Sequence, residues 1–243
     1  MSDLAIRRTR TFQEGAVSQA EVARFNALAS RWWDPRGPMR PLHAMNPARI
    51  GWIVERTARR FPDPAGVRLL DVGCGAGLAA EALGRHGFDV LGIDAAPDVI
   101  AAARAHGGET GPAYRVCVAE DLQAEGARFP VITALEVIEH VPDPAAFVRV
   151  LTGLLEPGGL LFLSTLNRTR RSLLVAKLGA EYVLRLLPIG THDWKQFITP
   201  AELAGLLREA GARVTDTAGL SPGLAGWRAT RDLGVNYLLA AEV

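Results

Sequence analysis

The run Val67-Arg-Leu-Leu-Asp-Val-Gly-Cys-Gly-Ala-Gly77 decides the fold of this chain. Its apolar first half has the character of a buried parallel strand, and its second half carries three glycines at alternate positions. Residues 78–86 have helical character and stop before Gly87, a residue type that often ends helices. The three glycines are therefore expected on a strand-to-helix turn, where backbone N–H groups can approach a ligand closely.

The order of residues in this turn indicates its ligand. The turn glycines are Gly73, Gly75 and Gly77. Asp71 precedes them, whereas a dinucleotide-binding turn has its third glycine one residue later. A carboxylate here would repel a pyrophosphate and would suit an ammonium group. The next expected strand, 88–94, ends on Asp94, where an acidic residue can accept hydrogen bonds from both ribose hydroxyls. S-adenosylmethionine, a nucleoside with a cationic tail and no phosphate, fits both carboxylates. An NAD site and a turn without a ligand are the alternatives.

Strand–helix alternation continues downstream, and over about residues 67–165 the chain resembles the class I S-adenosylmethionine-dependent methyltransferases. Such enzymes place an acidic residue near the adenine after the third strand. Here the corresponding sequence is Ala119-Glu-Asp-Leu122, which implies that Asp121 contacts the cofactor. The expected third to fifth strands are 114–118, 131–135 and one that begins near residue 155. The resemblance implies a doubly wound, Rossmann-like α/β fold with a seven-stranded, mostly parallel sheet whose last strand is antiparallel.

Composition and charge limit the function classes. The chain has 243 residues, of which 49% are hydrophobic and 22% charged, as expected for one α/β domain with additions. A net charge of +1 gives no basis for bulk nucleic-acid binding. The two cysteines, Cys74 and Cys117, are expected as small buried hydrophobic residues in a reducing compartment. No secretory signal and no run of 18 apolar residues is found, so we expect a cytoplasmic protein.

The flanking segments are expected to be helical additions. Residues 1–16 are expected to be a disordered arm, and 17–243 to form the methyltransferase domain, with N-terminal helices over 17–62. Ser18 and Glu21 form a capping-box pattern for a helix that runs to about residue 30. Asn46-Pro47 predicts the start of a second helix. Trp32 and Trp33 follow the first helix and could cover the cofactor, anchor at a lipid interface or pack in the core. The last two strands are expected over 212–217 and 235–242.

A long segment, 167–190, interrupts the alternation after the fifth expected strand. Loops of this size are often functional. Within it, residues 168–187 combine a wide apolar face with five basic residues and one acidic residue. This composition is typical of a helix that lies on the surface of an anionic membrane. The alternative is a lid over the substrate cleft. The segment thus predicts a helical insert and leaves peripheral membrane contact and a lid as open readings.

The candidate catalytic residues are Glu136, Glu139 and His140, just after the fourth expected strand. On a helix, these positions would share one face. Two carboxylates and an imidazole can hold a divalent cation such as Mg²⁺, which would lower the pKa of a bound phenol and orient its ring. The second reading makes His140 a metal-free general base, and the third makes it a structural residue. His192 and Lys195 are further candidate proton acceptors.

Motifs outside the central region give a closer resemblance. They are Ser30-Arg-Trp-Trp-Asp34, Pro41-Leu-His-Ala-Met-Asn-Pro-Ala-Arg-Ile50, Glu139-His-Val-Pro-Asp-Pro144, Ser164-Thr-Leu-Asn-Arg168 and Gly190-Thr-His-Asp-Trp-Lys-Gln-Phe197. In these motifs the chain is similar to the bacterial ubiquinone-biosynthesis O-methyltransferases. The resemblance implies methylation of a ring hydroxyl of 2-polyprenyl-6-hydroxyphenol and of 3-demethylubiquinol, within a multi-enzyme complex.

The same resemblance implies which residues contact the cofactor and the metal. The implied cofactor contacts are Arg49, Gly73, Asp94 and Leu135, and the implied metal ligands are Glu136, Glu139 and His140. Arg49 is independently a candidate for binding the methionine carboxylate. Two other functions stay open. One is methylation of a soluble phenol with His140 as the base, and the other is a nucleotide-binding regulatory module of a lipid-synthesis complex.

Overall fold

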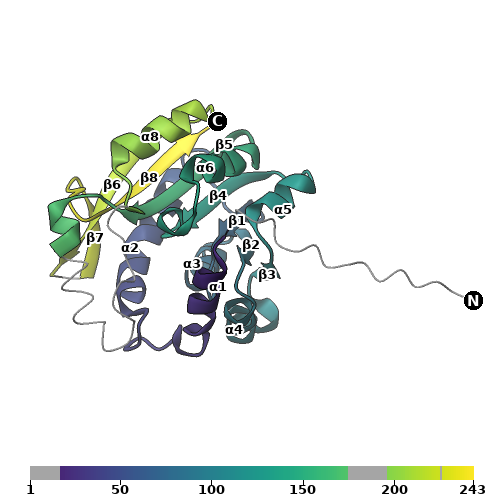
Figure 1. Ribbon diagram of the computed structural model, residues 1–243. Helices are drawn as coiled ribbons and strands as arrows, with labels where there is room; N and C mark the ends of the chain where they lie inside the picture. Colours follow the sequence, from purple (N-terminus) through teal and green to yellow (C-terminus); the bar gives the residue numbers. More distant parts are fainter. Residues whose placement is uncertain (1–16, 175–195, 225) are drawn as a thin grey trace, which may run out of the picture.

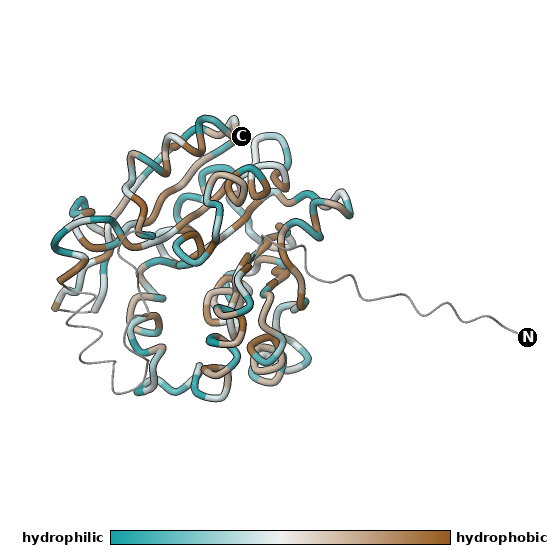
Figure 2. The backbone as a smooth tube through the Cα atoms, viewed as in Figure 1, coloured by the Kyte–Doolittle hydropathy of each residue, from teal (hydrophilic) through white to brown (hydrophobic). Residues whose placement is uncertain are grey.

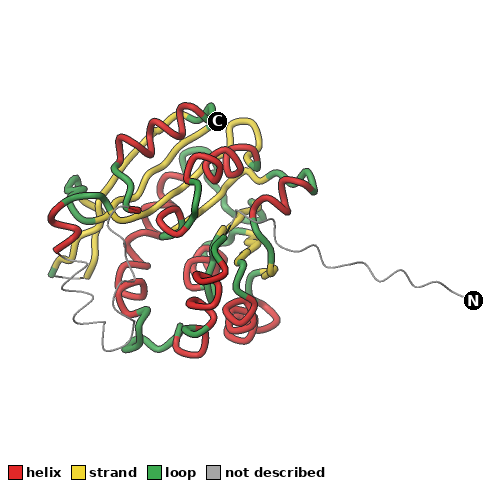
Figure 3. The backbone as a smooth tube through the Cα atoms, viewed as in Figure 1, coloured by secondary structure: helices red, strands yellow, loops and turns green. Residues whose placement is uncertain are grey.

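The computed structural model describes residues 17–174, 196–224 and 226–243. The described chain forms one twisted sheet between two layers of helices (Figures 1 and 3). Its strands are β1 (Arg68–Val72), β2 (Asp89–Asp94), β3 (Ala113–Val116), β4 (Phe129–Leu135), β5 (Leu155–Leu166), β6 (Arg213–Gly223), β7 (Gly226–Thr230) and β8 (Asn236–Glu242). The predicted arm over 1–16 and most of the predicted insert, from 175 onward, lie outside the described residues.

The sheet has the order β3-β2-β1-β4-β5-β8-β6-β7, and its first five strands are parallel. β8 is antiparallel to both of its neighbours, β5 and β6. The doubly wound, mostly parallel fold class is therefore confirmed. The predicted strand count of seven was too low, because the described sheet has eight strands. β6 continues past Thr217, since Ala218 and Leu220 are buried against the α2 side, and the chain then returns as β7.

Side chains at alternate strand positions point to opposite faces of the sheet and pack into two separate hydrophobic cores, one on each face. Leu69 of β1 packs with α2 (Arg40–Thr57), α3 (Leu78–Arg85) and α4 (Pro97–Gly107). Leu70 packs with α5 (Ala119–Ala124), α6 (Pro144–Gly153) and α8 (Pro200–Glu209) on the other face. The central strand β4 is mainly brown in the hydropathy colouring of Figure 2, as expected for a strand covered on both faces.

The N-terminal helices differ from the prediction. α1 (Gln19–Asn26) is followed by a short 3₁₀ helix, η1 (Ala29–Arg31), and the side chain of Ser18 makes no cap hydrogen bond. The predicted capping box is therefore wrong, because the carboxylate of Glu21 is used elsewhere. α2 begins at Arg40, six residues before the predicted cap, and contains Pro47 in its interior. Asn46 cannot cap α2, because its side chain is buried and donates to the Leu78 carbonyl oxygen at 2.9 Å.

Residues 17–39, which we call the N-terminal cover, lie over the carboxyl ends of the strands. Trp32 and its apolar neighbours on the cover form a third core cluster with Ala76 and Val99. The Trp33 indole N–H donates to the Ala76 carbonyl oxygen at 2.9 Å, and its ring stacks on His106 with centroids 3.4 Å apart. Asn26 accepts the Asp98 backbone N–H at 3.0 Å. These hydrogen bonds and ring contacts hold the N-terminal cover against the glycine turn and α4.

Candidate active site

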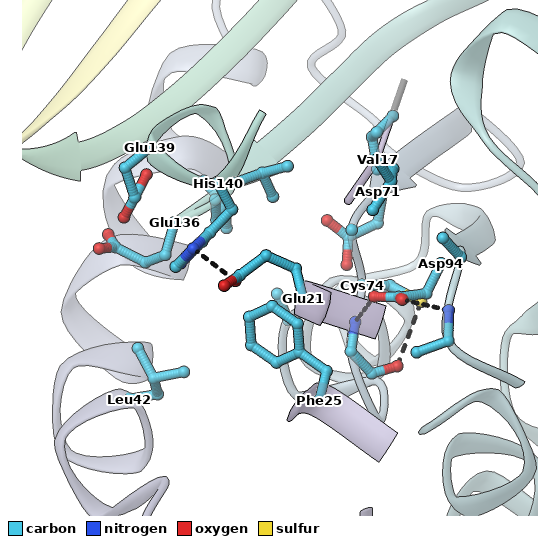
Figure 4. A pocket seen from close by; sticks show the side chains of 18 of the residues that line it. Val17, Glu21, Phe25, Leu42, Asp71, Cys74, Asp94, Glu136, Glu139 and His140 are labelled. Carbon is cyan, nitrogen blue, oxygen red and sulfur yellow. Dashed lines mark hydrogen bonds and ion pairs between the residues drawn. The ribbon is translucent and has the colours of Figure 1, made fainter. Parts of the chain in front are cut away.

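A cavity of about 400 Å³ lies at the carboxyl ends of β1, β2 and β4, beneath the N-terminal cover. In Figure 4, Asp71 and Asp94 lie on one side of this cavity and the Glu136, Glu139 and His140 side chains lie on the other. The carboxyl edge of an open parallel sheet is the usual ligand site of such folds. The two sides have different chemistry, with the glycine turn on one and the acidic residues beside His140 on the other.

Asp71 presents a buried acceptor that the described residues leave without a partner. The residue ends the apolar run of β1 and is 2% exposed. Its Oδ1 accepts a hydrogen bond from the Thr133 hydroxyl at 2.7 Å, whereas Oδ2 is buried and accepts none from a described residue. Burial, with a smaller contribution from Asp94, raises the pKa of Asp71 to about 6. A cationic ligand group at Oδ2 would offset this desolvation.

Asp94 links the glycine turn to the end of β2. Its Oδ2 accepts the Gly75 backbone N–H at 3.0 Å, and its Oδ1 accepts the Ala96 N–H at 2.9 Å. Burial raises the pKa of this carboxyl, and the backbone N–H donors oppose that effect. Gly75 has a φ of +55°, and a Cβ added there would lie 2.1 Å from the Trp32 ring. The turn therefore requires glycine for its backbone conformation and for the close approach of the cover.

Arg49 lines the cavity, and a hydrogen bond to Asn46 holds its side chain in place. It lies on α2, is 3% exposed, and donates from Nε to Asn46 Oδ1 at 3.1 Å. The same Asn46 side chain is fixed by the Leu78 carbonyl. Burial lowers the pKa of Arg49, and the negative charges of Glu136 and Asp71 oppose the shift. A guanidinium in this position is suited to binding a ligand carboxylate.

Glu136 begins the acidic side of the cavity in an unusual backbone conformation. Its φ is +58°, the one left-handed conformation of a residue other than glycine in the described chain. Its N–H donates to the Ser164 carbonyl oxygen at 3.0 Å and to Ser164 Oγ at 3.1 Å, and that hydroxyl donates to Glu136 Oε1 at 2.6 Å. Strained residues of this kind persist where surrounding contacts hold them, often at functional sites. Ser164 therefore fixes both the backbone and the carboxylate of Glu136.

Glu139 lies deeper than Glu136 and is 4% exposed. Its Oε2 accepts a hydrogen bond from the Thr165 hydroxyl at 2.8 Å. Burial, and next the charge of Glu136, raise the pKa of Glu139 to about 7. When two neighbouring carboxyl groups are both shielded from water, ionising both costs free energy. Glu139 therefore keeps its proton to a higher pH than an exposed glutamate.

His140 pairs with a residue from the N-terminal cover. Its Nδ1 lies 3.0 Å from Glu21 Oε2, and the Phe25 ring meets the imidazole edge-on at a centroid distance of 5.4 Å (Figure 4). Burial lowers the pKa of His140, but Glu21 and Glu139 outweigh it, so the pKa is raised above its usual 6.5. The condition under which Glu136, Glu139 and His140 would share one helical face is not met, because these residues do not lie on an α-helix. A single 3₁₀ turn, η3 (Ile138–His140), follows the left-handed Glu136, and α6 starts only at Pro144.

The predicted metal ligands were compared with what a divalent cation requires. Within residues 17–174, 196–224 and 226–243, no three His, Cys, Asp or Glu side chains are grouped so that they could hold a metal ion. His140 faces Glu21 through Nδ1, and the two nearby carboxylates already accept hydroxyl hydrogen bonds. As placed, these residues do not fit a metal ion, and the metal stays a prediction from the sequence.

The chain was compared with known proteins. A family model described as "Methyltransferase domain" matches residues 44–217. The ubiquinone biosynthesis O-methyltransferase of Cereibacter sphaeroides is 47% identical over 237 residues, covering 93% of this chain and 96% of that protein. The protein of the same name from Xanthomonas axonopodis pv. citri is 49% identical and covers 92% and 93% of the two chains.

The chain belongs to the ubiquinone biosynthesis O-methyltransferase family.

Solved structures agree at the level of the fold. An S-adenosylmethionine-dependent methyltransferase from Mesorhizobium loti superposes with a TM-score of 0.57 at 21% identity, covering 80% of this chain and 98% of that one. A Synechocystis magnesium protoporphyrin IX methyltransferase with bound SAH gives 0.58 at 20% identity, covering 79% of each chain. The class I methyltransferase fold and the family expected from the sequence motifs are therefore confirmed for this O-methyltransferase.

Most of the predicted site residues meet in the one cavity. Those that line it are Arg49, Asp71, Gly73, Gly75, Asp94, Leu135, Glu136, Glu139 and His140. Gly77 and Asp121 do not line it. A Cβ at Gly77 would lie 2.2 Å from the Tyr114 hydroxyl, so this glycine serves packing. Asp121 is exposed and accepts the Val118 N–H at 3.2 Å at the start of α5, while its neighbour Glu120 lines the cavity. His192 and Lys195 lie outside the described residues.

Sequence reasoning missed the contribution of α1 to the site. Glu21 and Phe25 both reach His140, although the sequence pattern predicts Glu21 in a helix cap. The available signal was their spacing of four residues, which places an acidic side chain within the apolar face of an amphipathic helix. Ser164 was also missed, because its role depends on a strand neighbouring β4 rather than on local sequence.

Proposed function

We propose that this O-methyltransferase uses S-adenosylmethionine to methylate a ring hydroxyl of 2-polyprenyl-6-hydroxyphenol and of 3-demethylubiquinol. The observation that carries the proposal is that one cavity combines two groups of residues. One group, on the glycine-turn side, offers charges complementary to a zwitterionic nucleoside. The other offers an imidazole and two carboxyl groups for proton transfer.

The first group accounts for cofactor binding. Arg49 would bind the methionine carboxylate, and the unpartnered Oδ2 of Asp71 would accept the ammonium group. Asp94, already fixed by two backbone N–H donors, would accept the ribose hydroxyls. When bound, S-adenosylmethionine supplies a methyl group on a sulfonium, which a phenolate oxygen can displace with release of the thioether.

The second group accounts for activation of the phenol. A phenol has a pKa near 10, so it reacts poorly until its proton is removed. His140 would take this proton, since its ring lies in the cavity and its pKa is raised by Glu21 and Glu139 even though burial lowers it. The phenol O–H bond breaks toward His140 as the oxygen forms its bond to the methyl carbon. Alignment of these groups in one cavity is the main requirement of a direct displacement.

The remaining cavity wall suits a prenylated ring. Apolar side chains from the N-terminal cover, α2, η3 and the segments beside them line it, including Val22, Phe25, Leu28, Leu42, Val137, Val141 and Leu166. An isoprenoid tail gains free energy from contact with such a surface. The relatives' name, ubiquinone biosynthesis O-methyltransferase, refers to the synthesis of a compound with this kind of tail.

A product assay tests the proposal. Purified protein is incubated with S-adenosylmethionine and a short-tailed 3-demethylubiquinol, and mass spectrometry measures the gain of one methyl group. The same ring without its tail is the control substrate. We expect product from the tailed quinol, with far less from the tailless ring. Equal rates on both would favour a soluble phenol as substrate. Binding of S-adenosylhomocysteine without turnover of any phenol would favour a regulatory module.

The predicted divalent cation requires a separate test. The sequence predicts that magnesium stimulates turnover and that Glu136→Ala removes this stimulation. The assay is therefore run with magnesium and with excess chelator. Full activity in chelator would contradict the metal prediction and leave His140 as the base.

Peripheral membrane contact through residues 168–187 also stays a proposal, because most of this segment lies outside the described residues. Two of its basic residues form ion pairs with acidic residues elsewhere in the fold. Arg168 pairs with Glu202, and Arg171 pairs with Asp232 at 2.6 Å. No helix in the described part of the chain is long and apolar enough to cross a membrane. We expect co-sedimentation with anionic vesicles that high salt reverses. Absence of binding at low salt would leave the lid reading.

A further inference from the structure

We infer that Trp32, on the N-terminal cover, is a further cofactor-binding residue whose indole N–H donates a hydrogen bond to an oxygen atom of S-adenosylmethionine. This inference rests on the cofactor-binding part of the proposed function. Its basis is a buried hydrogen-bond donor that no described residue accepts, in a side chain that lines the cavity beside the glycine turn.

The Trp32 side chain is buried, but its polar atom is not satisfied within the described chain. The residue is 6% exposed, and Nε1 makes no hydrogen bond to any described residue. Most buried polar groups in native proteins have a partner, and an unpaired one costs free energy. The next indole shows the usual case, since Trp33 donates to the Ala76 carbonyl oxygen. The unpaired N–H of Trp32 therefore points to a ligand that supplies the acceptor.

The position of the Trp32 ring is fixed by contacts that do not involve its N–H. The ring belongs to the third core cluster, together with Leu28, Met39 and Val99. The Trp32 backbone carbonyl oxygen pairs with His43 Nε2 at 2.8 Å. A donor that is held in place before the ligand arrives loses little conformational entropy on binding. Trp32 is thus a pre-positioned donor.

The unpaired donor lies next to the glycine turn. A Cβ added at Gly75 would lie 2.1 Å from Cζ2 and 2.9 Å from Cε2 of the Trp32 ring. Nε1 is bonded to Cε2, so the N–H belongs to the edge of the ring that meets this glycine. Both residues line the cavity, and the Gly75 N–H is already accepted by Asp94. The indole N–H therefore adds a second kind of group, a free donor, at this end of the cavity.

The cofactor offers the acceptors that this donor needs. An indole N–H only donates, so it cannot pair with the ammonium or sulfonium group. The oxygen atoms of the ribose and of the methionine carboxylate can accept. Asp71 and Asp94 provide acceptors for the donors of the cofactor, whereas Trp32 provides a donor for one of its oxygens. Ribose and carboxylate oxygens share this chemistry, and the experiment separates them.

Paired tryptophan-to-phenylalanine substitutions test the inference. Trp32→Phe removes the N–H and retains an aromatic ring. Trp52→Phe is the matched control, because Trp52 is 4% exposed, its Nε1 also makes no hydrogen bond to a described residue, and it does not line the cavity. Calorimetry measures the affinity for S-adenosylhomocysteine and for 5′-methylthioadenosine, which retains the ribose and lacks the carboxylate. Urea titration without ligand measures the stability of each variant.

We expect Trp32→Phe to weaken binding of S-adenosylhomocysteine by about 5–50-fold, as for the loss of one hydrogen bond. Trp52→Phe should match the parent protein in affinity. The two variants should shift the urea midpoint to a similar extent, because each loses part of an indole and no hydrogen bond to a described residue.

The second ligand identifies the acceptor. An equal loss of affinity for 5′-methylthioadenosine in Trp32→Phe would assign the N–H to the ribose. A loss confined to S-adenosylhomocysteine would assign it to the carboxylate. Parent-like affinity of Trp32→Phe for both ligands would overturn the inference, since the indole would then serve packing alone.

Proton–nitrogen NMR of the indole groups supplies a readout that depends neither on turnover nor on a variant. The protein has five tryptophans, whose indole signals can be assigned by triple-resonance spectra of the parent protein. On addition of S-adenosylhomocysteine, the Trp32 indole proton should move downfield, as a proton does when it forms a hydrogen bond, and the Trp52 signal should stay in place. An unmoved Trp32 signal at saturating ligand would overturn the inference. A parent protein that shows the shift but methylates no phenol would instead contradict the proposed substrates alone.

Discussion

Asp94 Oδ2 accepts a hydrogen bond from the backbone N–H of Gly75 at 3.0 Å. This contact joins the carboxyl ends of β1 and β2, which are neighbouring parallel strands. The residue that the sequence assigns to the ribose therefore also shapes the turn that would receive the rest of the cofactor. Binding and local stability are coupled at this position.

Replacing Asp94 should lower both the affinity for the cofactor and the stability of the turn. We expect Asp94→Ala to weaken binding of S-adenosylhomocysteine by about 100-fold, since charge-assisted hydrogen bonds to the ribose are lost. Loss of the two backbone hydrogen bonds should lower the free energy of unfolding by about 1–3 kcal/mol. Calorimetry and urea titration measure the two effects. Unchanged affinity would contradict the ribose role.

Gly75→Ala should be among the most destabilising changes in the turn. Alanine at this position would have to adopt a left-handed backbone with φ +55°, and its Cβ would overlap the Trp32 ring. Gly126→Ala is the matched control, because Gly126 has φ +73° with no atom within 4 Å of an added Cβ. We expect the control to cost about 1–2 kcal/mol from backbone strain and Gly75→Ala to cost more. Equal losses would show that the cover does not press on the turn.

Binding of S-adenosylhomocysteine should weaken in mild acid through Asp71. Its pKa of about 6 means that the carboxylate is mostly ionised at pH 7 and mostly protonated at pH 5. A protonated Asp71 cannot pair with the ligand ammonium, so affinity should fall about tenfold between these values. The charged groups that act on Asp71 are Arg49 and Asp94. Calorimetry at several pH values measures the effect.

The control for this prediction is Asp71→Asn, which should remove most of the pH dependence and leave the smaller contribution of Asp94. The folding effect has the opposite sign in the cofactor-free protein. The pKa of Asp71 is raised from 3.8 to about 6, so its contribution to stability is greatest below the lower value and declines as pH rises to the higher one. An affinity that stays level from pH 7 to 5 would contradict an ammonium partner.

Ser164→Ala should disturb the acidic side of the cavity through Glu136. The hydroxyl donates to the carboxylate of Glu136, which has a left-handed backbone, and shares the Glu136 N–H with the Ser164 carbonyl oxygen, which the variant retains. We expect a loss of about 1–3 kcal/mol in unfolding free energy and a clear fall in kcat. Ser221→Ala, in the β6–β7 hairpin, is the same chemical change outside the cavity and should leave kcat unchanged. Parent-like turnover in Ser164→Ala would show that Glu136 needs no such support.

Local sequence was enough to predict much of the fold and the position of two carboxylates on the glycine-turn side of the cavity. The apolar run before the glycine turn predicted β1, and Asp94 at the end of the next strand predicted a second carboxylate at the same edge. These inferences succeed because strand ends of a parallel sheet meet at one edge whatever the surroundings. Local patterns failed where a side chain had two possible partners. Asn46 could cap a helix or bond Leu78, and the folded chain uses the second.

The sequence by itself determined the parallel sheet, the glycine turn and the family, since these depend on the order of residues within short segments. Only the tertiary structure decided that Glu21 meets His140, that Ser164 holds Glu136 and that Trp32 closes on Gly75. The physical reason is that hydrophobic burial folds α1 and η1 across the strand ends, and this long-range packing chooses which polar groups meet. The spacing of Glu21 and Phe25 indicates that they share one face of α1, but it does not indicate which polar group that face meets.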